Sequence, residues 1–201
     1  MSKYDELLSE IEDFKERRVY ITKKARMNAE ERYLQYYDYT QIVLTVASVS
    51  MIALSVLTLI APNQNFDTWN LIISIYLLGI TLIITGFKLK ERADEHKNSY
   101  IKITLVEVKI ETLYSSLRDG EIDEESDAYQ LFADIKNEYV DVLSNTVNHK
   151  NIDYLKASKK SFGDSIKVLI RESLRKLLFG MCVIFPVSIV IIKFVFFGEQ
   201  L

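Results

Sequence analysis

The feature that most constrains this chain is a stretch of 47 residues, 41–87, that carries a single charge, Asp67. The charge lies in a short polar break, 61–68, which separates two apolar runs, 41–61 and 69–87. A helix of roughly 20 mostly apolar residues is long enough to cross the hydrocarbon core of a bilayer. Two such runs joined by a polar turn therefore predict a transmembrane helical hairpin.

Composition favours an all-α membrane protein built around this hairpin. The 201 residues include only six Gly and two Pro, which is typical of long helices. Nearly all charged residues fall in 1–40 and 88–176, so we expect a cytoplasmic N-terminal helix at 1–40 and a cytoplasmic helical region at 88–176. The net charge of −3 gives no overall basic field, and direct nucleic-acid binding is not expected.

The distribution of lysine and arginine predicts the orientation of the hairpin. Residues 1–40 contain eight of them, the turn 62–68 contains none, and residues 88–102 contain five. Cytoplasmic flanks of membrane helices are enriched in these residues. The N-terminus and the region after the hairpin are therefore expected in the cytoplasm, and the turn outside.

A third apolar segment, 177–198, follows a basic stretch, so its start is expected in the cytoplasm. Its polar residues are Ser188 and Lys193, and it contains Pro186. The favoured interpretation is a third transmembrane helix, in which the stem of Lys193 reaches the far interface. A shorter interfacial or re-entrant helix kinked at Pro186 is the alternative.

The charged region after the hairpin predicts a cytoplasmic helical hairpin. Apolar residues recur at helical spacing over 88–118, and Asp119-Gly120 is a typical helix stop. A second helix is expected over about 124–147, followed by a polar connector at 148–154. The candidate connector residues are His149, Asp153 and Tyr154.

No pattern of catalytic residues occurs in the sequence. It has no GxSxG, no Gly-rich phosphate loop, no HExxH and no paired-cysteine spacing, so enzymatic activity, a cofactor and a metal site are not expected. Of the two histidines, His96 is expected to be a solvated helix residue. Cys182 lies inside an apolar run and is expected to be a small apolar filler.

Small polar residues line one face of each hairpin run. At about 100° per residue they form a stripe along most of each helix, although Ser50 and Thr58 fall outside it. The stripe consists of Gln41, Thr45, Ser48 and Ser55 in the first run and Asn70, Ser74, Thr81 and Thr85 in the second.

Two interpretations of the stripes stay open. Hydroxyl side chains mediate close packing of membrane helices, where an interhelical hydrogen bond contributes about 0.6–2 kcal/mol. Alternatively, a homo-oligomer turns the stripes inward to line a polar path across the bilayer. The pattern by itself favours packing. Neither run contains a charged residue, so the charge selectivity of a pore is expected to be weak.

The order of these segments resembles a known family. The run 20–32, YITKKARMNAEER, leads into the first apolar run, and NHKNIDY at 148–154 follows the charged helices. Together they resemble the SLATT family, the two-transmembrane effector domains of bacterial nucleotide-signalling conflict systems, over most of residues 10–165. The third apolar segment is additional to the two-span plan and resembles the subgroup linked to reverse transcriptases.

The resemblance implies an antiphage effector of the bacterial inner membrane. Such an effector forms a homo-oligomeric pore when it is triggered, and the loss of membrane potential causes growth arrest or abortive infection. It also implies a cytosolic partner, such as a nucleotide-signal-producing enzyme or a reverse transcriptase, and it raises the pore interpretation above packing. The alternative from another class is a non-conducting membrane adaptor that recruits a cytosolic signalling enzyme.

Overall fold

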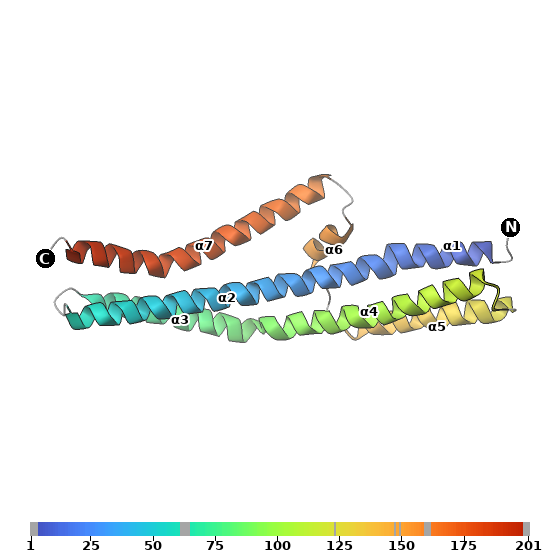
Figure 1. Ribbon diagram of the computed structural model, residues 1–201, viewed down its shortest axis with the longest axis horizontal. Coiled ribbons are helices and arrows are strands. Elements are labelled where there is room, and N and C mark those ends of the chain that lie inside the picture. The colour runs from blue at the N-terminus through green and yellow to red at the C-terminus, as the bar shows by residue number, and fades with distance from the viewer. Residues whose placement is uncertain are drawn as a thin grey trace. The chain divides into compact units, whose positions relative to one another are not determined.

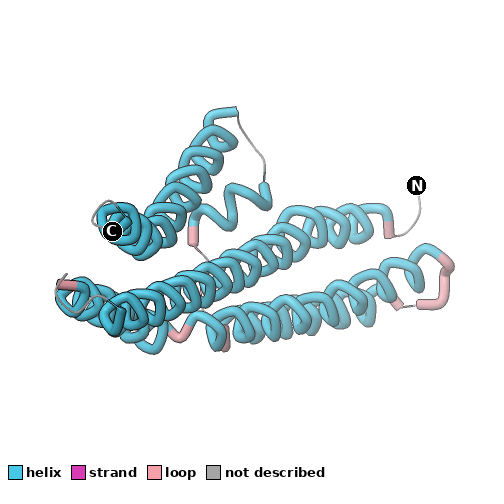
Figure 2. Tube along the Cα trace, turned by 60° about the vertical axis from the view of Figure 1, so that its left-hand side comes forward, coloured by secondary structure: helices cyan, strands magenta, loops and turns pink. Residues whose placement is uncertain are grey.

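The fold is all-α, as the sequence predicts. We analysed a computed structural model, which describes residues 4–60, 65–122, 124–146, 148, 150–158 and 162–198. Throughout these residues every regular element is helical (Figure 2). In chain order the elements are α1 (Asp5–Phe14), the π-helical turn η1 (Lys15–Tyr20), α2 (Ile21–Ile60), α3 (Phe66–Phe87), α4 (Leu89–Arg118), α5 (Glu125–Ser144), α6 (Asn151–Ser158) and α7 (Phe162–Gly198).

The first three elements follow one another without a break, because no Gly or Pro occurs in the sequence before Pro62. The backbone stays helical from α1 to α2, but its hydrogen-bond pattern changes from α to π in η1. A π turn is wider than an α turn and changes the phase of the side chains. The buried face nevertheless continues from Leu7 and Ile11 in α1 through Val19 in η1 to Ala25 and Ala29 in α2.

The sequence predicts a helix over 88–118 that continues from the second apolar run, and the structure differs at its start. Lys88 has a left-handed backbone conformation with φ +48°, which ends α3 and lets α4 begin at Leu89. The predicted stop at Asp119-Gly120 is confirmed, since α4 ends at Arg118 and Gly120 has φ +73°. Glycine suits that position because it has no Cβ to oppose a positive φ.

The chain divides into two compact units. Unit 1 comprises Met1–Arg32 and Glu91–Val168, and unit 2 comprises Tyr33–Lys90 and Leu169–Leu201. Unit 1 contains most of the charged sequence, and unit 2 contains the apolar runs. The predicted domain boundaries relative to a bilayer stay predictions.

Unit 1 has a core between α1, α4 and α5, which lie side by side (Figure 1). One apolar face of each helix is buried there, including Leu7, Ile110 and Phe132. The ring of Phe14 stands edge-to-face against Phe132 and Tyr139, with centroids 5.7 Å and 5.4 Å apart. Edge-to-face aromatic contacts are directional, so they help fix the orientation of α1 on α5.

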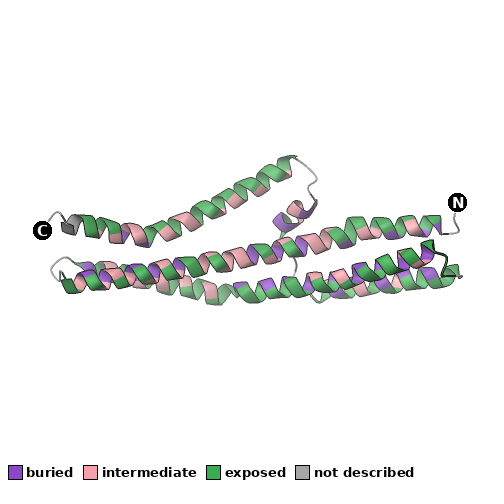
Figure 3. Cartoon of the chain, viewed as in Figure 1, coloured by how far each residue is buried: buried purple, intermediate pink, exposed green. Residues whose placement is uncertain are grey.

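Unit 2 has a small core and an apolar exterior. Its buried residues include Ala47, Leu54, Ile73 and Ile189, from α2, α3 and α7. Large apolar side chains elsewhere on these helices are exposed, and Figure 3 shows most of α7 in the colour for exposed residues. Three described helical stretches are long and apolar enough to cross a membrane, and they lie within 5–60, 66–118 and 162–195. An apolar exterior on helices of this length is what contact with lipid requires.

The segment predicted as a polar connector is partly helical. Asp153 and Tyr154 lie in α6, whose first residue is Asn151, while His149 lies outside the described residues. The backbone N–H of Lys150 donates to the Asp153 carboxylate at 3.0 Å. A side chain that reaches back to the residue before the first helical turn is half of a capping box. Asp153 therefore explains why a helix starts in this polar sequence.

Candidate functional site

At one end of the hairpin, the predicted polar stripe lies between α2 and α3. The Asn70 side-chain N–H donates to the Ser55 hydroxyl at 2.9 Å, and the Ser74 hydroxyl lies 3.2 Å from the Met51 sulfur. Asn70 and Ser55 come from different stripes, and the structure brings them together. At this end, next to the turn, the stripes therefore face each other.

At the other end of the hairpin, the same stripes are exposed. Gln41, Thr45, Thr81 and Thr85 are all exposed to the surroundings of unit 2, and Ser48 is half-buried between the two ends. The three threonines donate to carbonyls of their own helices, four residues back, at 2.8–2.9 Å. A hydroxyl that is satisfied in this way costs little in lipid and leaves the oxygen able to accept another bond.

The contacts between the helices give the register of the hairpin. Ser55 meets Asn70 and Met51 meets Ser74. Because α2 and α3 run antiparallel with the same rise per residue, this register places Thr45 at about the level of Thr81 and Gln41 at about the level of Thr85. Each copy of unit 2 therefore carries exposed polar side chains at two neighbouring levels. Their role in lining a pore or in packing stays a prediction.

The third membrane-length helix, α7, packs on the hairpin through specific contacts. The Tyr76 hydroxyl donates to the Cys182 carbonyl at 2.8 Å, and the Lys193 amine lies 5.4 Å from the centre of the Trp69 ring. The Cys182 side chain itself is exposed and does not fill the small core of unit 2. Lys193 on Trp69 places a cation and an indole together near the turn, a combination typical of an interface.

In unit 1, the predicted residue Asp153 forms a buried ion pair. The Arg32 guanidinium donates two parallel hydrogen bonds to the Asp153 carboxylate, each 2.9 Å long, and the Asn28 side chain donates to the Asp153 carbonyl at 3.0 Å. The Asp153 side chain is 1% exposed. Paired, bidentate geometry is what makes such burial tolerable. This cluster, which we call the α2–α6 tie (Asn28, Arg32, Asp153), attaches α6 to α2; Tyr154 lies beside it on α6, half-buried.

The sequence did not single out Arg32 and Asn28 as partners of Asp153. Their four-residue spacing puts them on one face of a helix, and the half capping box of 150–153 marks Asp153 as a structured residue. Those two signals were present. The pairing itself joins positions 121 residues apart, which periodicity does not reveal.

A second arginine of α2 is buried, and no acidic side chain among the described residues pairs with it. Arg26 is 1% exposed, and its Nε and Nη1 atoms have no hydrogen-bond partner among the described residues. Burial lowers the pKa of Arg26, although a guanidinium stays protonated at any physiological pH. Nearby Tyr139 donates to the Arg18 carbonyl at 3.4 Å and shares a hydrogen bond with Thr22. An unpaired buried cation is costly, so unit 1 contains a locally unfavourable site.

The expectation for His96 is wrong. It is 2% exposed on α4, in the row of buried positions that also includes Ala93 and Ser99. Its charged sequence neighbours, Asp94 and Glu95, are exposed on the other side of the helix. The sequence context suggested a solvated residue because it is charged as a whole, and only the three-residue spacing of 93, 96 and 99 indicates a buried face.

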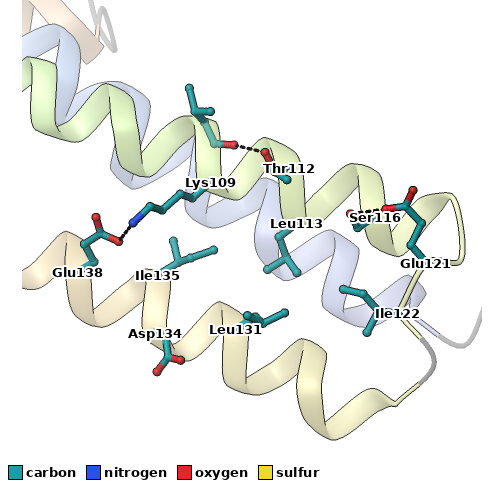
Figure 4. Close-up of a pocket in the computed structure, with 11 residues that line it drawn as sticks. Lys109, Thr112, Leu113, Ser116, Glu121, Ile122, Leu131, Asp134, Ile135 and Glu138 are labelled. Carbon is teal, nitrogen blue, oxygen red and sulfur yellow. Dashed lines mark hydrogen bonds and ion pairs between the residues drawn. The ribbon is translucent and has the colours of Figure 1, made fainter.

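A groove of about 580 Å³ lies between α4 and α5. Figure 4 shows Leu113, Ile135 and Leu131 between the two helices. Acidic residues and one ion pair, Lys109 to Glu138 at 2.6 Å, stand at its edge. The groove is apolar inside and has no arrangement of a nucleophile with a base, so it can bind an apolar group but offers no chemistry. In the described residues, no three His, Cys, Asp or Glu side chains come together to hold a metal ion.

Comparison with known families gives one match. A family model described as "SMODS and SLOG-associating 2TM effector domain family 5" matches residues 8–198. No curated protein and no solved structure matches the chain. The match extends through the α2–α6 tie, the hairpin and α7, so it covers both units.

Proposed function

The chain belongs to SMODS and SLOG-associating 2TM effector domain family 5, a SLATT family, and from this premise we propose that it is a pore-forming effector of antiphage defence. In this proposal the protein lies in the bacterial inner membrane with its N-terminus in the cytoplasm. Copies of unit 2 assemble as a homo-oligomer, and the membrane loses its potential. The family description names SMODS and SLOG, so the link to reverse transcriptases stays a prediction.

The observation that carries the proposal is the exposed half of the polar stripes. The exposed residues lie outside the small core of unit 2 at two levels, with Thr45 and Thr81 at one level and Gln41 and Thr85 at the next. A single helical hairpin cannot enclose water, so these side chains need other copies to form a polar path. With both flanks in the cytoplasm, this path would begin at the cytoplasmic end of the membrane.

The other end of the hairpin supplies a reason for gating. There the stripes face each other through Ser55 and Asn70, which bond to each other across the two arms. An open path across the whole bilayer then requires α2 and α3 to rotate or separate near the turn. A change of this kind is a two-state rearrangement of packed helices, which a trigger can bias.

Unit 1 supplies the surface on which a trigger would act. Its groove between α4 and α5 is apolar inside and acidic at the edge, which fits an amphipathic, basic helix of a cytosolic partner. We propose that this partner is a nucleotide-signal-producing enzyme, the class of partner that the family name suggests.

The test is dye release from liposomes that contain the purified full-length chain at increasing protein density. We expect release that rises steeply with density, because a path requires several copies. Thr45→Leu combined with Thr81→Leu should abolish it, since both substitutions fill one polar level with apolar side chains. Both positions are exposed, so the hairpin should still insert.

A matched control separates polarity from added bulk. Val49→Leu combined with Val56→Leu adds a methylene at two exposed apolar positions of α2 and should release dye like the parent chain. If the parent chain releases no dye at any density, the non-conducting adaptor is the better description. Full release by the Thr45→Leu, Thr81→Leu variant would remove the polar levels from the mechanism.

A further inference from the structure

In the part of α7 that precedes the third apolar segment, the side that contacts α2 is not the most apolar side of the helix. Arg175 donates to the Gln35 side chain at 2.7 Å and lies over the Tyr36 ring, and one turn later Phe179 stacks on Tyr39 with centroids 4.3 Å apart. The side of α7 that holds Arg175 and Phe179 therefore faces α2. This side combines a charged residue with an aromatic one, and the more apolar side of the helix does not contact α2.

The apolar side of this segment faces away from α2. Leu169, Ile170, Leu174 and Leu177 lie about 100–160° around the helix from Arg175. All four are exposed, each by more than half of its surface. In a soluble protein such a face would be turned to the core. Its exposure indicates that something outside unit 2 covers it.

Cations border this apolar face on both sides. Lys176 lies about 20° around the helix from Leu169, and Arg171 lies about 60° from Leu174. Both cations are exposed. The acidic residue of the same turns, Glu172, is half-buried and lies about 60° from Arg175 on the α2-facing side. The free surface of this segment therefore combines an apolar stripe with positive edges, as helices at the surface of anionic membranes do.

The length of α7 places this surface at the depth of lipid headgroups. The 22 residues from Leu177 to Gly198 span about 33 Å at 1.5 Å per residue, close to the thickness of the hydrocarbon core. The eight preceding residues, 169–176, add about 12 Å on the cytoplasmic side, so they pass through the headgroup layer of that leaflet. The exposed side continues into the apolar segment through Met181 and Ile184. The same face therefore meets lipid along its whole length.

We propose that the turns of α7 before Leu177 form a binding site for the anionic headgroups of phospholipids in the cytoplasmic leaflet. Leu169, Ile170 and Leu174 enter the headgroup layer, and Arg171 and Lys176 pair with lipid phosphates. The site rests on the proposed orientation of the chain, but not on pore formation or on a homo-oligomer. It would hold the cytoplasmic end of α7 at the membrane surface in the resting protein.

The experiment uses the full-length chain with Cys182→Ser, so that one introduced cysteine can carry a fluorescent label. The label is placed at Ile170→Cys, which is 61% exposed, or at Val140→Cys on α5, which is 60% exposed and serves as the matched control. Each chain is reconstituted in nanodiscs of phosphatidylcholine, without or with a quarter of phosphatidylglycerol. Quenching by acrylamide, which is uncharged, then measures access to water.

We expect the label at Ile170→Cys to be quenched about threefold less than the label at Val140→Cys in the anionic nanodiscs, with weaker protection in phosphatidylcholine alone. Equal quenching at the two positions would overturn the proposal. Efficient disulfide formation between copies through Ile170→Cys would overturn it as well, since a second copy would then cover the face. Neither result depends on dye release, so failure here is distinguishable from failure of the proposed pore.

A charge reversal tests the headgroup contacts. Arg171→Glu combined with Lys176→Glu should remove the extra protection that phosphatidylglycerol gives, while the helical circular dichroism of the chain stays unchanged. Lys97→Glu combined with Lys102→Glu reverses two exposed lysines of α4 and should leave the protection intact. Protection that survives reversal of the α7 cations would show that their charges do not recognise the lipid.

Discussion

Units 1 and 2 are both built from long helices, but they satisfy their polar groups differently. In unit 1, polar side chains join helices that are far apart in the sequence, as Arg32 and Asp153 do over 121 residues. In the hairpin of unit 2, the threonine hydroxyls donate to carbonyls four residues back in their own helices, and the contacts between the arms are Asn70 to Ser55 and Ser74 to Met51. Bonds between different helices fix how those helices pack. Bonds within one helix do not restrict which neighbour the helix packs against.

This difference supports the proposed division of roles, in which unit 1 receives the trigger and the hairpin of unit 2 rearranges. A bidentate ion pair is lost if its helices shift by one turn, so it favours a single geometry. A hydroxyl bonded to its own helix keeps that bond when the helix rotates or changes partners. The two arms of the hairpin can therefore change their packing at a small cost in hydrogen bonds, while unit 1 changes state only by breaking specific contacts.

Breaking the α2–α6 tie should give the largest effect on unit 1. Asp153→Asn leaves the buried Arg32 guanidinium without its counter-charge, and removal of one partner from a buried pair costs about 3–5 kcal/mol. We expect the amides of α6 to exchange with deuterium at close to the rate of an unfolded segment, as measured by mass spectrometry of the full-length chain. The amides of α3 in unit 2 should be unaffected.

The matched control is an exposed ion pair of the same unit. Glu138→Gln breaks the pair with Lys109, in which both side chains are more than a third exposed, and such pairs contribute about 0–1 kcal/mol. Exchange in α6 should then stay as in the parent chain. If Asp153→Asn also left α6 protected, the tie would not be what holds α6 on α2.

Most of the fold was predictable because it depends on periodicity and length. The apolar runs predict the membrane-length helices, and Asp119-Gly120 predicts the end of α4. The break at Lys88 was not predictable, since a lysine in a left-handed conformation has no local sequence signal. The π-helical turn η1 was not predictable either, since the apolar positions before and after it, such as Ile11 and Ala29, keep the same phase at about 100° per residue.

The site was predictable in its residue types and not in its pairings. The stripes of small polar residues are evident at helical spacing, but which half faces inward depends on how α2 and α3 pack. Similarly, Asp153 stood out, whereas its partner Arg32 did not, because tertiary contacts are not periodic. Arg26 and His96 were missed for a further reason: burial of a charged or titratable residue runs against its ordinary preference for solvent.

An intermediate effect is expected from Arg26, which, unlike Arg32, has no acidic partner among the described residues. Arg26→Met keeps a long, flexible side chain and removes a buried charge, and replacement of buried charges by apolar residues stabilises proteins by about 1–4 kcal/mol. We therefore expect amides of α2 and α5 near Tyr139 to exchange more slowly. The measurement is the same deuterium exchange of the full-length chain.

The control for Arg26→Met is the same change at the paired arginine. Arg32→Met should speed exchange in α6, because it leaves the buried Asp153 carboxylate uncompensated. The two arginines are less than two turns apart. Opposite changes in exchange rate for the two variants would show that a buried arginine stabilises the protein only when it has an acidic partner. Destabilisation by both substitutions would mean that Arg26 makes a contribution that its contacts do not explain.

The smallest effect is expected in unit 2, from the Asn70 to Ser55 hydrogen bond. Interhelical hydrogen bonds in membranes contribute about 0.6 kcal/mol on average, and the Asn70 carbonyl oxygen has no partner among the described residues, so the value should not exceed this average. We expect a double-mutant cycle of Asn70→Leu and Ser55→Ala to give a coupling of this size. Reversible unfolding in detergent, followed by the fluorescence of the adjacent Trp69, measures it.

The size of this coupling decides how easily the hairpin arms separate near the turn. Thr85→Val serves as the control, since its hydroxyl bonds to its own helix and its loss should show no coupling to Ser55→Ala. A coupling of several kcal/mol between Asn70 and Ser55 would make unit 2 as specifically fixed as unit 1. The arms would then be locked at the turn, and a path across the bilayer would have to form between whole hairpins, without rotation of α2 against α3.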